Sequence, residues 1–108
     1  DHYVNQLFQF MTRGGSREQA MVDRLLFSAM IEARSCERFK LLSERIKDPE
    51  LSKFYRELMI SEAGHYTTFI GFARKYGQGV AIDQRWQELI EFEGEIIKNY
   101  GKSETIHG

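Results

Sequence analysis

The chain has little of two residue types that constrain folds: one cysteine, Cys36, and one proline, Pro49, in 108 residues. A lone cysteine excludes an internal disulfide and suits a reducing compartment, so we expect a cytoplasmic protein. No apolar run is long enough to cross a membrane, and no signal peptide is visible. The net charge of −1 means that composition gives no indication of nucleic-acid binding.

The residues that are abundant indicate a small helical domain. Hydrophobic residues make up 42% of the chain and charged residues 29%, which is typical of a globular protein with a modest core. The scarcity of proline and the lack of alternating β-branched runs predict an all-α fold. The chain begins at Asp1, not at a methionine, and in the middle of a helical pattern, so we expect a fragment or a processed product.

Turn and capping residues divide the chain into four predicted helices, over residues 3–12, 16–46, 49–75 and 83–99. Ser16 and Gln19 form the sequence pattern of a capping box at the start of the second helix. Asp48 and Pro49 predict a tight reversal, so the second and third helices should form a long antiparallel hairpin.

Glycines mark the remaining predicted helix ends. The first helix should stop at Gly14-Gly15, the third at Gly77 and the fourth at Tyr100-Gly101. The polar tail 102–108 is expected to fray or dock loosely.

Two apolar stripes on the predicted hairpin are interrupted by polar residues. The first stripe consists of Val22, Leu25, Ala29, Glu32, Cys36 and Phe39, and the second of Leu51, Tyr55, Leu58, Glu62, His65, Phe69, Phe72 and Tyr76. Steps of three and four place each set on one packing face of a helix. A carboxylate on such a face loses water and must be neutralised, paired or bound to a metal. Glu32, Glu62 and His65 therefore predict a metal site between the two helices.

The hairpin geometry brings these three residues to the same height. Glu32 lies 15 residues before Lys47, at the reversal, and Glu62 lies 15 residues after it. Equal rise along two antiparallel helices places Glu32 opposite Glu62, with His65 one turn away. Glu37 lies off the stripe, so Glu32 is the better ligand candidate.

One Glu on one helix and Glu-x-x-His on its partner form half of the ligand set of a ferritin-like di-iron bundle. Residues three apart share a helix face, so Glu62 and His65 can contact one ion. A complete site needs another helix pair, either from missing N-terminal helices or from a second copy of the chain. The alternatives are a chance Glu-x-x-His match and a hydrogen-bonded Glu32 without metal.

Three runs of residues resemble a known family: Ile31–Phe39 (IEARSCERF), Phe54-Tyr55 and Ser61–Tyr66 (SEAGHY). They resemble the C-terminal half of the tRNA-(2-methylthio-isopentenyladenosine) hydroxylases, the MiaE family, and the likeness covers nearly the whole chain. The resemblance implies that residues 1–108 are the C-terminal part of a single ferritin-like di-iron domain. It implies hydroxylation of the isopentenyl group of a modified adenosine beside the anticodon.

The same resemblance implies the cofactors and partners. It makes Glu32, Glu62 and His65 ligands of two iron ions, with no catalytic residue beyond the metal site. Dioxygen would be the co-substrate, tRNA the substrate and an external donor the source of electrons. The alternatives are another ferritin-like di-iron oxidase or iron-binding protein, or a metal-free helical interaction domain.

Charged residues outside the two hairpin stripes carry three further expectations. Glu93 falls on an apolar stripe of the fourth helix and is expected to form a salt bridge at its rim. A basic strip should be a solvated face; its members are Arg34, Arg38 and Arg45. If tRNA binds near the site, the candidates for phosphate contacts are Arg13, Arg17 and Arg24.

Overall fold

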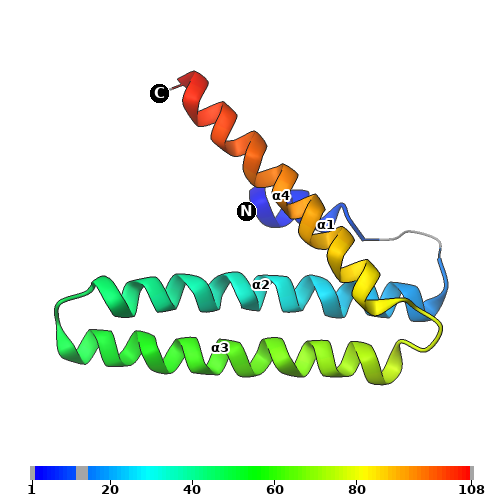
Figure 1. Ribbon diagram of the computed structural model, residues 1–108, viewed down its shortest axis with the longest axis horizontal. Coiled ribbons are helices and arrows are strands. Elements are labelled where there is room, and N and C mark those ends of the chain that lie inside the picture. The colour runs from blue at the N-terminus through cyan, green and yellow to red at the C-terminus, as the bar shows by residue number, and fades with distance from the viewer. Residues whose placement is uncertain (1, 12–14, 108) are drawn as a thin grey trace.

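The computed structural model describes residues 2–11 and 15–107 and consists of four helices (Figure 1). They are α1 (His2–Phe8), α2 (Arg17–Arg45), α3 (Pro49–Tyr76) and α4 (Ile82–His107). The described residues contain no strand, which confirms the all-α prediction. None of the helices in the described part of the chain has the length and apolar content that a membrane span requires.

The long helices α2 and α3 form the predicted antiparallel hairpin (Figure 1). Ser16 caps α2, because its hydroxyl accepts a hydrogen bond from the Gln19 amide at 3.0 Å. The Gln19 side chain does not complete a capping box but donates to Asp23 at 2.8 Å. Asp48 caps α3 by accepting bonds from the backbone amides two and three residues further on, at 2.9 and 3.0 Å. Both predicted helix ranges are therefore correct within one residue.

Gly77 ends α3 at a point where the backbone lies against Val22 of α2. Its amide bonds to the carbonyl of Ala73 at 2.9 Å, and the residue is buried. A Cβ atom built at this position would overlap both a methyl group of Val22 and the Ala73 carbonyl oxygen. Glycine is needed here because of this close approach, since its φ of −90° is open to other residues.

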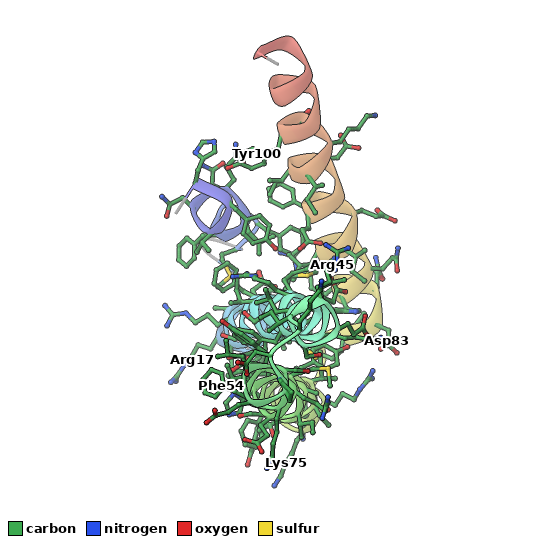
Figure 2. The ribbon with its side chains drawn as sticks, turned by 90° about the vertical axis from the view of Figure 1, so that its left-hand side faces the viewer. Arg17, Arg45, Phe54, Lys75, Asp83 and Tyr100 are labelled. Atoms are coloured by element: carbon green, nitrogen blue, oxygen red, sulfur yellow. The ribbon has the colours of Figure 1, made fainter. Side chains whose placement is uncertain are left out.

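Helix α2 is packed on two sides, with α3 on one side and α1 and α4 on the other (Figure 2). The apolar core therefore joins all four helices; its members are Leu7, Val22, Leu26, Met30, Ala73, Leu89 and Ile96. Because α1 and α4 pack on the side of α2 that faces away from α3, they leave one flank of the hairpin uncovered. This is the flank from which Arg17 and Phe54 project (Figure 2).

Two predicted helix ends were wrong. Helix α1 ends at Phe8, and the chain continues with tighter bonds from the amides of Gln9, Phe10 and Met11 to carbonyls three residues earlier. Helix α4 continues through Gly101 to His107, because Gly101 does not adopt the left-handed conformation and a glycine inside a helix costs only about 1 kcal/mol. The predicted end at residue 12 and the Gly14 break lie outside the described residues.

Candidate metal centre

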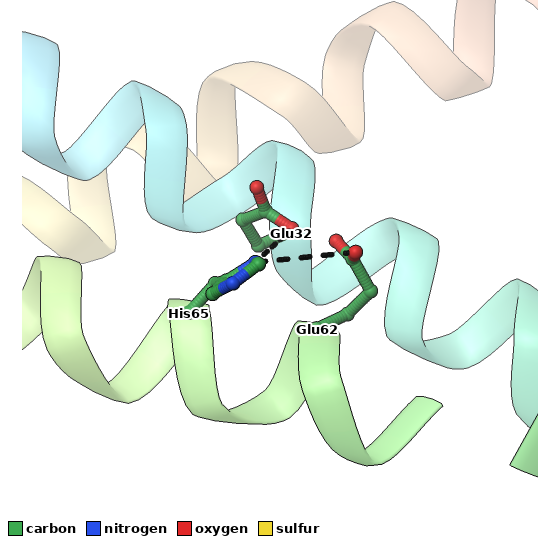
Figure 3. A group of neighbouring side chains, drawn as sticks. All are labelled: Glu32, Glu62 and His65. Carbon is green, nitrogen blue, oxygen red and sulfur yellow. Dashed lines mark ion pairs between the residues drawn. The ribbon is translucent and has the colours of Figure 1, made fainter. Parts of the chain in front are cut away.

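Glu32 on α2 and the pair Glu62 and His65 on α3 point toward one another across the hairpin (Figure 3). The His65 Nδ1 atom lies 3.7 Å from Glu32 Oε2 and 4.0 Å from Glu62 Oε1. One ligand atom from each residue can be chosen so that all three lie within 4.8 Å of one another. Ligand atoms around an ion bound at about 2.1 Å lie about 3 to 4 Å apart, so small side-chain adjustments would bring them to a common ion.

The two carboxylates are poorly hydrated, whereas the imidazole faces solvent. The side chains of Glu32 and Glu62 are 23% and 20% exposed, and that of His65 is 58% exposed. The buried Oε2 atom of Glu32 has no hydrogen-bond donor among the described residues. A buried carboxylate oxygen without a donor is costly, and a cation bound between the carboxylates would satisfy it. These residues therefore fit a metal ion with carboxylate and imidazole ligands.

An exposed apolar strip on α3 runs past the site on the uncovered flank of the hairpin. Large side chains at least 46% exposed lie on both sides of His65 along this strip: Leu51, Phe54 and Phe72. Three other apolar side chains of the two hairpin stripes, Leu25, Leu58 and Phe69, are only half-buried. The three candidate ligands thus lie beside a surface with room for further helices.

A buried ion pair lies behind the site, on the opposite side of α2. Glu93 of α4 is 1% exposed and accepts hydrogen bonds from the Arg34 guanidinium, with Nε at 2.7 Å, and from the Tyr3 hydroxyl. Burial alone would raise the pKa of Glu93, but the bonds from Arg34 and Tyr3 outweigh it and lower this pKa. Burial and the bond to Glu93 raise the pKa of Tyr3.

Two expectations are corrected by this cluster. Glu93 does form a salt bridge, but at a fully buried position and not at a rim, because this α4 residue lies between Tyr3 of α1 and Arg34 of α2. Arg34 does not belong to a solvated basic strip, since it bonds both Glu93 and Glu37. Arg38 is exposed, as expected for a solvated face.

A second buried ion pair was not predicted. Asp23 of α2 is 1% exposed and accepts bonds from Arg85 of α4 at 2.8 and 2.9 Å. The Arg85 guanidinium also lies over the Phe10 ring, 3.8 Å from its centroid. The signal was a second apolar stripe on α2, in which Leu26 and Met30 follow Asp23 at helical spacing.

The neighbours of the site have the roles expected of them. Glu37 is 64% exposed and pairs with Arg34, so it takes no part in the cluster of ligands. The Cys36 thiol lies 3.5 Å from the Met59 carbonyl oxygen, a weak bond between α2 and α3.

The sequence contains a second Glu-x-x-His, Glu104-Thr105-Ile106-His107, so the expectation of a missing helix pair was wrong in its premise that the chain has only one such motif. These residues form the last turns of α4, which project away from the hairpin (Figure 1). Helix α4 therefore does not bring this second motif to the Glu32 site.

The predicted phosphate contacts lie at one end of the hairpin. Arg17 and Arg24 are exposed on the first turns of α2 and line an open groove. Arg13 lies outside the described residues.

Comparison with known proteins relates the whole chain to one family. The family model described as tRNA-(MS2IO6A)-hydroxylase (MiaE) matches residues 1–108. The chain is 38% identical over 87 residues to a tRNA 2-(methylsulfanyl)-N(6)-isopentenyladenosine(37) hydroxylase of Pseudomonas putida, covering 81% of the chain and 42% of that protein. It is 34% identical over 87 residues to the protein of the same name from Salmonella typhimurium, covering 81% of the chain and 32% of the relative.

The chain thus spans less than half the length of the curated relatives it matches. No solved structure matches it. The match of the family model over the entire chain agrees with the resemblance seen in the residues around Glu32 and Glu62. The chain belongs to the MiaE family of tRNA hydroxylases.

Proposed function

We propose that this chain forms the C-terminal part of a ferritin-like di-iron domain that hydroxylates the isopentenyl group of 2-methylthio-isopentenyladenosine in tRNA. The observation that carries the proposal is the convergence of Glu32, Glu62 and His65 in a chain of this family. Two carboxylates and an imidazole suit iron, which binds oxygen and nitrogen ligands with positions left open. When bound, two iron ions would supply the activation of dioxygen that hydroxylation of an unactivated carbon requires.

The chain's own residues would hold the metal and shape its surroundings. Glu32 would satisfy its partnerless buried oxygen on an ion, and Glu62 and His65 would bind from consecutive turns of α3. Half-buried apolar side chains beside them, such as Leu58 and Phe69, would keep water from the prenyl chain.

A di-iron site needs more ligands than these three. The uncovered flank of the hairpin, with its exposed apolar strip, is the surface on which a second helix pair would complete the bundle. We place that pair in the part of the protein that corresponds to the rest of the relatives' length. A second copy of the hairpin, bound about a two-fold axis, would supply the same ligand types.

The test uses the full-length protein, purified from the cytoplasmic fraction in which we expect it, with tRNA, dioxygen and an electron donor. Glu62→Ala and His65→Ala should each lower the iron content and abolish hydroxylation, since each removes a ligand. Glu37→Gln is the control and should keep both the iron content and the hydroxylation activity, because Glu37 is exposed and lies outside the group of Glu32, Glu62 and His65.

Other outcomes identify the alternative functions. Iron without tRNA hydroxylation would indicate a different ferritin-like oxidase or an iron-binding protein. Full-length protein without iron would indicate a metal-free interaction domain. Wild-type turnover in the His65→Ala variant would reject the ligand assignment.

A further inference from the structure

A groove with a volume of about 800 Å³ lies between the first turns of α2 and the last turn of α3. Its floor is apolar, with Met21 and Leu25, and its edges carry Arg17 and Arg24 from α2 and Tyr76 from α3. One acidic residue, Glu18, also lines it.

The basic groups of the groove are available for an anionic ligand. Arg17 and Arg24 are exposed, and neither forms an ion pair with any described residue. Lys75 does not line the groove, but its Nζ atom lies 5.2 Å from the centroid of the Tyr76 ring. Two arginines against one carboxylate give this groove a positive balance that the chain as a whole, at −1, does not have.

An exposed aromatic ring lies among these cations. Tyr76 is 51% exposed, and the ring of Phe72, itself 46% exposed, lies 6.1 Å from it. Exposed rings beside guanidinium and ammonium groups are the features that bind single-stranded nucleic acid, because unstacked bases stack on the rings and phosphates pair with the cations. Two arginines without an ion pair beside this ring therefore favour a nucleic-acid strand as the occupant of the groove.

The groove and the metal centre lie along the same seam of the hairpin. Leu25 precedes Glu32 by two turns on one stripe, and Tyr76 follows His65 by three turns on the other. At 1.5 Å per residue, the centre lies about 12 Å from Arg24 along α2 and about 16 Å from Tyr76 along α3. Arg17 and Phe54 project from the same side of the hairpin (Figure 2). A strand with one nucleoside at the metal centre would therefore reach the groove a few nucleotides away.

We infer that this groove binds the single-stranded RNA that flanks the hydroxylated nucleoside, with phosphates on Arg17 and Arg24 and a base on Tyr76. The inference rests on the proposed tRNA hydroxylase function and adds to it the surface that positions the substrate. These residues position the strand, and none of them touches the reacting atoms.

The electrostatic part is tested with the iron-loaded full-length protein and an anticodon stem-loop RNA that carries 2-methylthio-isopentenyladenosine. Arg17→Gln/Arg24→Gln should weaken binding about tenfold or more. It should also reduce the slope of log affinity against log salt by about 1.4, because each phosphate that no longer pairs with an arginine lowers this slope by about 0.7. At saturating RNA, kcat should stay at the wild-type value while KM rises.

The matched control is Arg38→Gln/Arg45→Gln. Both arginines are exposed on the same helix, seven residues apart like Arg17 and Arg24, and without an ion pair among the described residues. The control makes the same change in net charge at the far end of the hairpin, so it should leave affinity and salt slope unchanged.

The stacking part is tested at Tyr76. Tyr76→Ala should weaken RNA binding about fivefold to one hundredfold with an unchanged salt slope, because stacking is not an ionic contact. Tyr76→Phe keeps the ring and should bind as the wild type does. Iron content and the melting temperature of each variant show whether the fold is intact.

The results separate this inference from the proposed function. If the wild type binds and hydroxylates the RNA and Arg17→Gln/Arg24→Gln behaves as the control does, the groove assignment is wrong and the hydroxylase function stands. If the double variant keeps its RNA affinity but melts well below the control, the groove is a contact within the protein. If iron-loaded wild type neither binds nor hydroxylates the RNA, the proposed function itself fails.

Discussion

Arg34 of α2 and Glu93 of α4 form an ion pair in which the carboxylate is 1% exposed and the guanidinium side chain 35% exposed. A carboxylate at such a position is held by its partners, and removal of one partner leaves a buried charge. The pair joins α2, which carries Glu32, to α4, which packs on the opposite side of α2. It therefore stabilises the position of α2 beneath the candidate metal centre.

Loss of the Arg34 partner should be severe. Arg34→Met is expected to lower the free energy of unfolding by about 3–5 kcal/mol, because it leaves Glu93 buried with Tyr3 alone as donor. Urea unfolding of the full-length protein measures this. Arg34→Met/Glu93→Leu should be less destabilised than Arg34→Met, since the charge is removed with its partner. Equal stability of the single variant and the exposed control Arg38→Met would contradict this account.

The same pair predicts a pH dependence. The folded pKa of Glu93 is lowered below its ordinary value of 4.5, so the unfolded chain binds this proton more readily. The stabilisation is therefore fully present above about pH 4.5 and is lost as the pH falls through the folded pKa. Melting temperatures of the wild type and Glu93→Gln from pH 7 to pH 3 should converge toward acid. A constant difference over this range would show that Glu93 does not contribute through its charge.

Metal binding should reverse the effect of Glu32→Gln on stability. Without metal, the variant loses one of two neighbouring carboxylates, and its melting temperature should rise. With Mn²⁺ added after chelation, the melting temperature of the wild type should rise more than that of the variant, because metal binding to the folded state stabilises the protein. Calorimetry with and without Mn²⁺ measures both effects. Glu37→Gln is the control and should respond to Mn²⁺ like the wild type.

Gly71 within α3 and Gly77, which ends this helix, should respond oppositely to alanine. Gly77→Ala should destabilise the protein by about 1–3 kcal/mol, because the added methyl group overlaps Val22 and the Ala73 carbonyl. Gly71 has nothing within 4 Å of an added Cβ, so Gly71→Ala should stabilise the hairpin by about 0.5–1 kcal/mol. Thermal unfolding of the two variants gives the comparison, and two changes of the same sign would refute it.

The hairpin and the height of its polar residues could be predicted from the sequence. Asp48 and Pro49 fix the reversal, and the regular rise of two helices then places Glu32 opposite Glu62 and His65. The stripe that contains these residues is local information, since it depends on spacing within one helix.

The second face of α2 could not be placed in the same way. The partners of Asp23 and Arg34 come from α4, 62 and 59 residues away in sequence, and no local pattern gives the direction in which α4 crosses α2. The predicted end of α4 was also wrong, because Gly101 resembles a stop signal but keeps a helical backbone, without the left-handed conformation that commonly ends a helix at a glycine.

The two buried ion pairs between α2 and α4 are arranged in opposite senses: α2 supplies the acid of one pair and the arginine of the other. Near the start of the interface the acid, Asp23, belongs to α2 and the arginine to α4; further along, the acid, Glu93, belongs to α4 and the arginine to α2. If α4 were docked in the reverse direction, Glu93 would meet Asp23 and Arg85 would meet Arg34. Two such repulsive contacts would cost several kcal/mol each. The pairs therefore encode the direction of α4, which apolar contacts, lacking any polarity, cannot specify.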